Sequence, residues 1–142
     1  MDKEGLIKEA FLARKNSYSP YSGYRVGAAL LCGDGRIVRG ANIENASYGA
    51  TVCAERCAVF AAVASGNTDL TAIAIVGGDG SEEDAVSSYA HPCGICRQVL
   101  REFTDPAKFT VIVARSVSDY KEYKLSELLP ESFGPDNLSK EE

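Results

Sequence analysis

The chain has 142 residues, of which 45% are apolar and 25% are charged, which is enough for one globular domain with a substantial core. Its formal net charge is −5 and Lys and Arg do not cluster, which argues against a nucleic-acid partner. No apolar stretch approaches the roughly 20 residues that span a bilayer, so we expect no membrane insertion.

The first half of the chain predicts a helix, a hairpin and a second helix. Apolar residues recur at helical spacing near the N-terminus, so we expect an amphipathic helix over residues 2–16. Segments 24–32 and 36–44 have the composition of strands, and the glycine-containing turn between them predicts a hairpin. An alanine-rich helix is expected over 53–66, with Gly66 at its C-terminal cap.

The second half continues the alternation of strands and helices. We expect a buried strand over 70–78, then a polar loop, a helix over 93–103, a strand over 108–115 and a short helix over 124–130. A tail follows, whose last residues are expected to be frayed. The order predicts an α/β fold of three layers, α/β/α, in which helices cover a mixed sheet that opens with an antiparallel hairpin. All 142 residues are expected to form one domain.

Three of the five cysteines fall at the starts of the two central helices. Cys93 and Cys96 form a Cys-x-x-Cys pair, a familiar metal-ligand spacing, and Cys53 opens the other helix. Helix N-termini favour thiolates because their N–H groups are unsatisfied and their dipole end is positive. A redox pair or two buried core cysteines are the alternatives. Because the chain begins with charged residues and not with a secretion signal, we expect reduced thiols and a cytosolic protein.

Cys57 lies one helical turn after Cys53, and the spacing leaves its role open. A closed structural zinc site with four cysteine ligands would use it, whereas a catalytic site would leave it in the packed face of the helix. Glu55 favours the catalytic interpretation, because a hydrolytic metal site needs a group that accepts and delivers protons. Cys53-x-Glu55 and the Pro-Cys-x-x-Cys motif at 92–96 match the signature of the zinc nucleobase deaminases.

The sequence resembles the cytidine deaminases of the small homotetrameric kind over roughly residues 6–138. The matching stretches are "SPYSGYRVGAAL", "GANIENASYG", "CAERCAVF", "PCGICRQ" and "LLPESFGPDNL", and "NIENASYG" narrows the resemblance to enzymes of free nucleosides. It implies zinc-dependent deamination of cytidine and deoxycytidine to uridine and deoxyuridine, with release of ammonia, in pyrimidine salvage. It also implies a homotetramer that shares its active sites between subunits.

The same resemblance implies which residues bind metal and move protons. One Zn²⁺ per chain is expected on Cys53, Cys93 and Cys96. Glu55 is expected to carry protons from the attacking water to ring N3 and then to the departing amine. Arg56 is expected to hydrogen-bond the ligand sulfurs, where its charge would offset that of three thiolates.

For the substrate, the resemblance implies that the Ala54 N–H holds the pyrimidine carbonyl and that Asn42 and Glu44 bind the ribose hydroxyls. Phe133 is expected to enter a neighbouring subunit's site and pack on the base. The remaining positions expected to contact substrate are Tyr24, Ala46 and Tyr48.

Two residues depart from the pattern of the family. Tyr24 stands where a phenylalanine usually packs on the base, and its hydroxyl needs a partner if it is buried. His91 precedes the Pro-Cys motif where a smaller residue is usual, and at the end of a loop it is expected to be exposed and not to bind metal. The alternatives are a deaminase of another aminopyrimidine, such as an antibiotic nucleoside, or a structural four-cysteine module that binds a partner.

Overall fold

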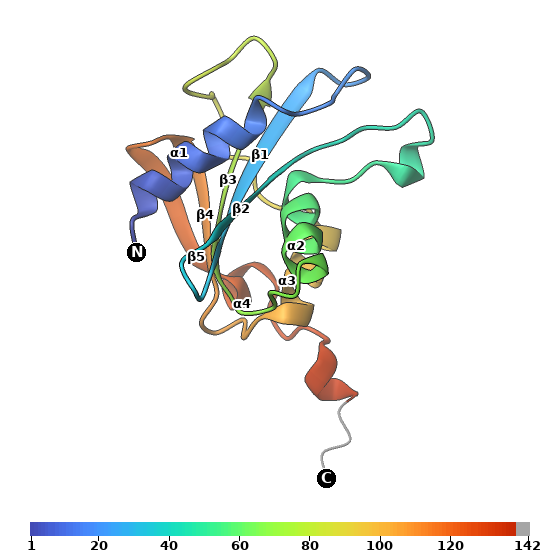
Figure 1. Ribbon diagram of the computed structural model, residues 1–142, viewed down its shortest axis with the longest axis vertical. Coiled ribbons are helices and arrows are strands. Elements are labelled where there is room, and N and C mark those ends of the chain that lie inside the picture. The colour runs from blue at the N-terminus through green and yellow to red at the C-terminus, as the bar shows by residue number, and fades with distance from the viewer. Residues whose placement is uncertain (139–142) are drawn as a thin grey trace.

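The computed structural model describes residues 1–138, in which five strands form one mixed sheet in the order β2-β1-β3-β4-β5 (Figure 1). The strands are β1 (Tyr24–Cys32), β2 (Ile37–Ala41), β3 (Leu70–Asp79), β4 (Thr110–Ser116) and β5 (Asp119–Lys124). The helices are α1 (Lys3–Arg14), α2 (Ala54–Ala64), α3 (Gly94–Phe103) and α4 (Leu125–Leu128), with short 3₁₀ turns at Tyr48–Ala50 and Pro135–Asn137. Strands β3 and β4 are parallel and the other pairs are antiparallel, so the predicted fold class and opening hairpin are confirmed.

Alternating side chains along the strands determine which helices cover which face of the sheet. Ile73 and Val111 pack in one core cluster with α2, α3 and α4, whereas their neighbours Ala74 and Ile112 pack in a second cluster with α1. Figure 1 shows α1 alone on one side of the sheet and α2 and α3 together on the other. The period of two in a strand therefore produces the three layers.

Two glycines allow helices to lie directly on the sheet. A Cβ atom at Gly40 in β2 would overlap the carbonyl oxygen of Ala54 and the backbone nitrogen of Ala58, both in α2. A Cβ atom at Gly27 in β1 would overlap the carbonyl oxygen of Ala10 in α1. Because α2 touches β2 at its first turn, the position of that turn is determined by the sheet and not by a flexible loop.

The side chain of Arg14 ties the end of α1 to the loop that follows β3. Arg14 is only 4% exposed. Its Nε donates to the carbonyl of Arg25 at 2.8 Å, and Nη2 donates to Asp79 at 2.7 Å. Its Nη1 donates to the carbonyl of Glu82 at 2.6 Å. These hydrogen bonds give partners to the donors of the buried guanidinium, and they hold the start of the loop that leads to α3.

The structure differs from the sequence prediction mainly at the last strand. The predicted order of elements has no strand after 108–115, yet β5 follows β4 and forms an edge of the sheet. Its sequence, DYKEYK, is rich in charged residues, which are poor strand formers but are common on exposed edges. The strand predicted over 36–44 ends earlier, at Ala41.

The other boundaries agree within a few residues, and Gly66 follows α2 with a φ of +90°, as its predicted capping role requires. The expected fraying of the tail concerns residues 139–142, which lie outside the described part of the chain. None of the helices within residues 1–138 combines the length and the apolar character that a membrane crossing needs.

Candidate active site

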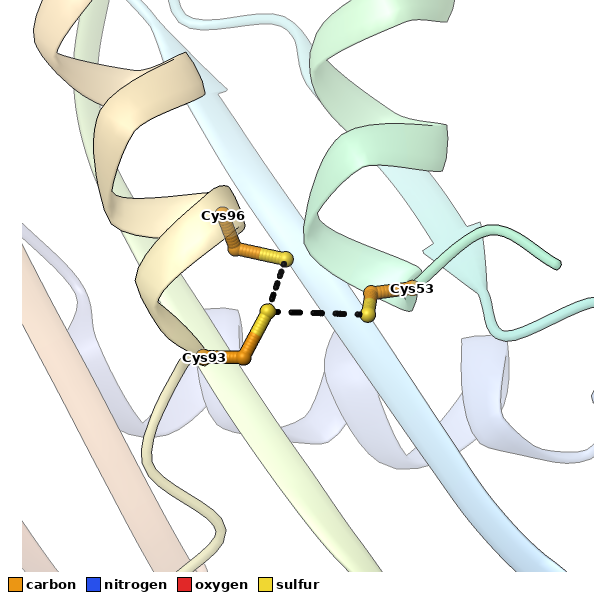
Figure 2. A group of neighbouring side chains, drawn as sticks. All are labelled: Cys53, Cys93 and Cys96. Carbon is orange, nitrogen blue, oxygen red and sulfur yellow. Dashed lines mark hydrogen bonds between the residues drawn. The ribbon is translucent and has the colours of Figure 1, made fainter. Parts of the chain in front are cut away.

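Three cysteine sulfurs meet where the N-termini of α2 and α3 converge (Figure 2). The Sγ atoms of Cys53 and Cys93 are 3.9 Å apart, those of Cys93 and Cys96 are 3.5 Å apart, and all three lie within 4.8 Å of one another. A tetrahedral zinc ion with Zn–S bonds of about 2.3 Å requires sulfurs roughly 3.8 Å apart. The arrangement therefore fits one zinc ion, held by three thiolates.

The helix ends explain why these sulfurs can converge. Cys53 and Cys93 are the N-cap residues of α2 and α3, and neither side chain makes a capping hydrogen bond. Their sulfurs are thus available beside the unsatisfied N–H groups of two helices, whose dipoles favour negative charge. The β3–α3–β4 connection places α3 beside α2, with which it is in contact.

Cys57 is not a member of this cluster within the described residues. It lies on α2 with its side chain partly buried. Three protein ligands leave a fourth position on a tetrahedral zinc ion, as in catalytic zinc sites, whereas a closed structural site needs four. The interpretation as a structural four-cysteine module therefore loses its geometric support.

Arg56 lies against the sulfur cluster, and its Nη2 donates to the Sγ of Cys53 at 3.4 Å. Hydrogen bonding with Cys96, and then with Arg56, lowers the pKa of the Cys53 thiol to about 5. The hydrogen bond to Cys53, together with burial, raises the pKa of the Cys96 thiol. Metal binding requires cysteine ligands as thiolates, so a bound cation would favour the deprotonated form of these sulfurs.

Glu55 occupies the first turn of α2, next to the sulfurs but outside their cluster. The residue is 4% exposed, and burial raises the pKa of its carboxyl to about 7. A carboxyl group with a pKa near neutrality can both accept and deliver a proton. Its position and chemistry therefore suit a proton carrier beside the metal site.

A cleft of about 420 Å³ opens beside the sulfurs, a volume suited to a small organic molecule. Several of the residues expected from the sequence line it: Tyr24, Asn42, Glu44, Cys53, Ala54, Glu55 and Cys93. The cleft is also lined by residues that the sequence analysis did not select for substrate contact: Ser22, Val26, Thr51, Val52, Ala90 and His91. Each of these lies within a few residues of a motif, and that proximity was the only signal in the sequence.

Two polar side chains at one end of the cleft are held by β1 and the turn before it. The side-chain oxygen of Asn42 accepts the N–H of Val26 at 2.9 Å, and its Nδ2 donates to the carbonyl of Tyr24 at 2.8 Å. The carboxylate of Glu44 accepts the backbone N–H of Ser22 at 3.1 Å, and hydrogen bonds from the Ser22 hydroxyl and backbone lower its pKa. Both side chains are therefore oriented before any ligand arrives.

Three of the residues expected to contact substrate are absent from the lining of this cleft within residues 1–138. Ala46 is exposed, and Tyr48, 76% exposed, lines a neighbouring hollow that it shares with Glu44. Phe133 is 59% exposed, and its carbonyl accepts a hydrogen bond from Nε2 of Gln98 at 2.9 Å. A single chain thus brings the cysteine sulfurs, Asn42 and Glu44 to one cleft, but not these three residues.

His91 is exposed, as expected, and is not a member of the sulfur cluster among the described residues. It nevertheless lines the cleft, and its Nε2 lies 3.1 Å from the hydroxyl of Tyr123 in β5. Tyr24, the other departure from the family pattern, is 40% exposed and also lines the cleft, with its hydroxyl near Ala90. Burial of its ring raises the pKa of its hydroxyl.

Known proteins resemble this chain over nearly its whole length. The family model described as the cytidine and deoxycytidylate deaminase zinc-binding region matches residues 1–113. The cytidine deaminase of Halalkalibacterium halodurans is 47% identical over 139 residues, which are 98% of this chain and 99% of that protein. The cytidine deaminase of Sporosarcina psychrophila is 44% identical over 139 residues, 98% of this chain and 96% of that protein.

Solved structures agree with the sequence comparison. A crystal structure of cytidine deaminase from Burkholderia pseudomallei superposes with a TM-score of 0.83 at 40% identity, covering 94% of this chain and 100% of the other. One from Mycobacterium tuberculosis superposes with a TM-score of 0.77 at 39% identity, covering 94% and 98%. The matched segment contains all three clustered cysteines. The chain therefore belongs to the cytidine and deoxycytidylate deaminase family.

Proposed function

We propose that this enzyme catalyses the hydrolytic deamination of cytidine and deoxycytidine to uridine and deoxyuridine, with release of ammonia. The observation that carries the proposal is a cleft in which three clustered thiols adjoin a buried carboxyl, Glu55. Relatives that match this chain over nearly their full length are cytidine deaminases, which supports the same substrate. When bound by Cys53, Cys93 and Cys96, zinc supplies the Lewis acidity that activates water for attack on ring C4.

The residues of the first turn of α2 would orient the base and move its protons. Glu55 would accept a proton from the attacking water and deliver it to ring N3. It would then take the proton of the hydroxyl group now on C4 and deliver it to the exocyclic amine, so that the C4–N bond breaks, the C4 carbonyl forms and ammonia leaves. The N–H of Ala54 is among the unpaired donors at the start of the helix, and it suits the pyrimidine O2 atom. Both groups lie on one rigid turn, so the N3–O2 edge of the base would face α2.

The other end of the cleft would hold the sugar. Asn42 and Glu44 are polar side chains already fixed by β1 and its preceding turn, and they suit ribose hydroxyl groups. Among residues 1–138, the lining of the cleft includes Glu44 and Glu55 but neither Lys nor Arg. A phosphate group would therefore meet negative charge without compensation, which favours free nucleosides as substrates.

We also infer that the enzyme is a homotetramer in which neighbouring subunits complete each site. Ala46, Tyr48 and Phe133 are exposed in one chain, and large exposed aromatic residues are typical of surfaces that bind a partner. Phe133 of a neighbour would stack on the base, while Tyr48 and Ala46 would line the shared site. The exposed ring of Phe133 contributes little hydrophobic stabilisation to a monomer. Its burial against a neighbouring subunit would therefore favour assembly.

A cytosolic role in nucleoside salvage agrees with the chemistry of the chain. All five cysteines are free thiols, as expected in a reducing compartment. The proposed reaction turns one reusable pyrimidine nucleoside into another, which suits recycling of nucleosides. Fractionation of cells that express the protein tests the cytosolic location, and recovery of the protein outside the cytosol would contradict it. Growth on cytidine of a strain that requires pyrimidines and expresses this protein tests the salvage role, and a lack of growth would contradict that role.

The first prediction concerns the substrate. The zinc-loaded enzyme should release ammonia from cytidine and deoxycytidine but much more slowly from cytidine 5′-monophosphate, because the described part of the chain places no Lys or Arg side chain in the cleft lining to meet a phosphate. An ammonia assay on matched nucleosides and nucleotides measures this, with adenosine as a negative control. Efficient turnover of the nucleotide, or of another aminopyrimidine nucleoside but not of cytidine, would contradict the proposal.

The second prediction concerns the proton carrier. Glu55→Gln keeps the shape of the side chain but removes its ability to exchange protons, so kcat for cytidine should fall by about 10²–10⁴-fold. Zinc content should stay near that of the wild type, because Glu55 is outside the sulfur cluster. Metal analysis on the same preparation is the control. A zinc-loaded variant with near-normal kcat would remove Glu55 from this role.

A third prediction tests the shared site. Phe133→Ala and Glu55→Gln should each be weakly active alone. When the two variants are unfolded, mixed and refolded, some sites should contain Glu55 from one chain and Phe133 from the other, and activity should return. A mixture no more active than its components, or an active monomer in sedimentation at low concentration, would show that each site belongs to a single chain.

A fourth prediction separates the three-thiolate site from a four-thiolate one. Cys57→Ala should retain about one zinc per chain and remain active, because its sulfur is outside the cluster. Cys93→Ala should lose zinc, activity and stability together, since metal affinity and folding are coupled. Metal analysis after dialysis and thermal unfolding provide the measurements. If both variants lost zinc equally, the open three-thiolate site would be wrong.

A further inference from the structure

The loop between β3 and α3 is attached to β5 at two places. The hydroxyl of Tyr89 donates to Asp119 at 2.5 Å, and the guanidinium of Arg115 lies 4.6 Å from the centroid of the same ring. Two residues further along, Nε2 of His91 lies 3.1 Å from the hydroxyl of Tyr123, with the ring centroids 5.6 Å apart. The edge strand thus fixes the part of the loop that forms one wall of the cleft.

His91 lies at the metal end of the cleft, because it precedes Cys93 by two residues and lines the cleft with it. Asn42 and Glu44 follow β2, which is one edge strand, whereas His91 is bonded to β5, the other edge strand. Asn42 is bonded to Val26 and Tyr24 of β1, so the sugar position and the metal position are the two ends of one cleft.

We propose that His91, oriented by Tyr123, is a specificity-determining residue that contacts the C5 side of the pyrimidine and hydrogen-bonds a polar group attached there. This inference rests on the proposed function for the orientation of the base. With the sugar at Asn42 and the N3–O2 edge facing α2, the C4 and C5 atoms point away from the sugar and C5 away from α2. Of the lining residues, Ala90 and His91 come from the loop before Cys93, at the metal end of the cleft, and Ala90 lies near the hydroxyl of Tyr24.

The chemistry of the pair suits a hydroxyl-bearing substituent. Either the imidazole or the phenol donates in the His91–Tyr123 hydrogen bond, and the other ring nitrogen, Nδ1, has no hydrogen-bond partner within residues 1–138. That nitrogen can accept from or donate to a hydroxyl group. Ala90, beside it, adds little bulk. A methyl group at C5 would gain no hydrogen bond here, so the residue should distinguish 5-hydroxymethyl from 5-methyl pyrimidines.

The test compares three substrates, cytidine, 5-methylcytidine and 5-hydroxymethylcytidine, in the wild-type enzyme and in His91→Ala. The wild type should turn over 5-hydroxymethylcytidine. In the variant, the ratio of kcat/KM for the hydroxymethyl substrate to that for the methyl substrate should fall about three- to tenfold, the value of one partly exposed hydrogen bond. The loss should be in KM, because the contact is the same in the ground and transition states.

Matched variants separate this contact from a general loosening of the loop. Tyr89→Phe breaks the other attachment to β5 without removing a polar group from the cleft, so the hydroxymethyl-to-methyl ratio should stay as in the wild type. Tyr123→Phe keeps the imidazole but frees it to rotate, so the ratio should fall less than in His91→Ala. His91→Asn retains a side chain that can hydrogen-bond and should recover part of the loss.

A binding measurement makes the result independent of turnover. Calorimetric titration with the products should show that 5-hydroxymethyluridine loses affinity relative to 5-methyluridine in His91→Ala by the same factor as the kinetic ratio. An unchanged ratio in His91→Ala, or a wild-type enzyme that deaminates cytidine but rejects 5-hydroxymethylcytidine, would overturn this inference alone. A wild-type enzyme that does not deaminate cytidine would overturn the proposed function, and the inference with it.

Discussion

A three-sulfur site requires two helices to begin within a few ångströms of each other, and packing against the sheet positions both helix N-termini. Helix α2 is positioned by direct contact with β2 at Gly40, and α3 is positioned by the parallel pairing of β3 and β4 on either side of it. The resulting sulfur separations, 3.9 and 3.5 Å, match those that one zinc ion imposes. The same constraint determines the positions of Ala54 and Glu55, because they belong to the first turn of α2, of which Cys53 is the N-cap.

The same geometry concentrates acidic groups, and the fold compensates for this by several means. Cys53 is stabilised as a thiolate through hydrogen bonds with Cys96 and Arg56, and the N-termini of two helices face the cluster. Glu55 responds in the opposite direction, since burial and then the nearby thiolate raise the pKa of its carboxyl. The pKa values of Cys53 and Glu55, which are close together in the chain, are thus shifted in opposite directions because their surroundings differ.

The sequence predicted most of the sheet and helices because their apolar residues follow regular periods. Buried strands such as β3 are unbroken apolar runs, and Gly66 marks the end of α2. The edge strand β5 was missed because it pairs on one side only, so charged residues are tolerated and the apolar pattern is lost. An edge strand is determined by its neighbour more than by its own composition.

The metal cluster could be predicted because a ligand motif is a local feature of the sequence, whereas the wall of the cleft could not. His91 lines the cleft because its loop is attached to β5, a contact between residues 32 positions apart. No local sequence pattern predicts such a contact. The roles proposed for Ala46, Tyr48 and Phe133 depend on neighbouring subunits, so they do not follow from the geometry of one chain.

The separation of Cys53 and Cys93 along the chain has a consequence for how tightly a metal can be held. Joining two points 40 residues apart in an unfolded chain costs about 4 kcal/mol of loop-closure entropy at room temperature. Here the packing of the sheet and its helices offsets that entropy during folding, so the sulfurs are already close together when an ion binds. Affinity for the ion is therefore partly a property of distant packing, and a substitution that loosens α1 against β1 at Gly27 would weaken metal retention without touching a ligand.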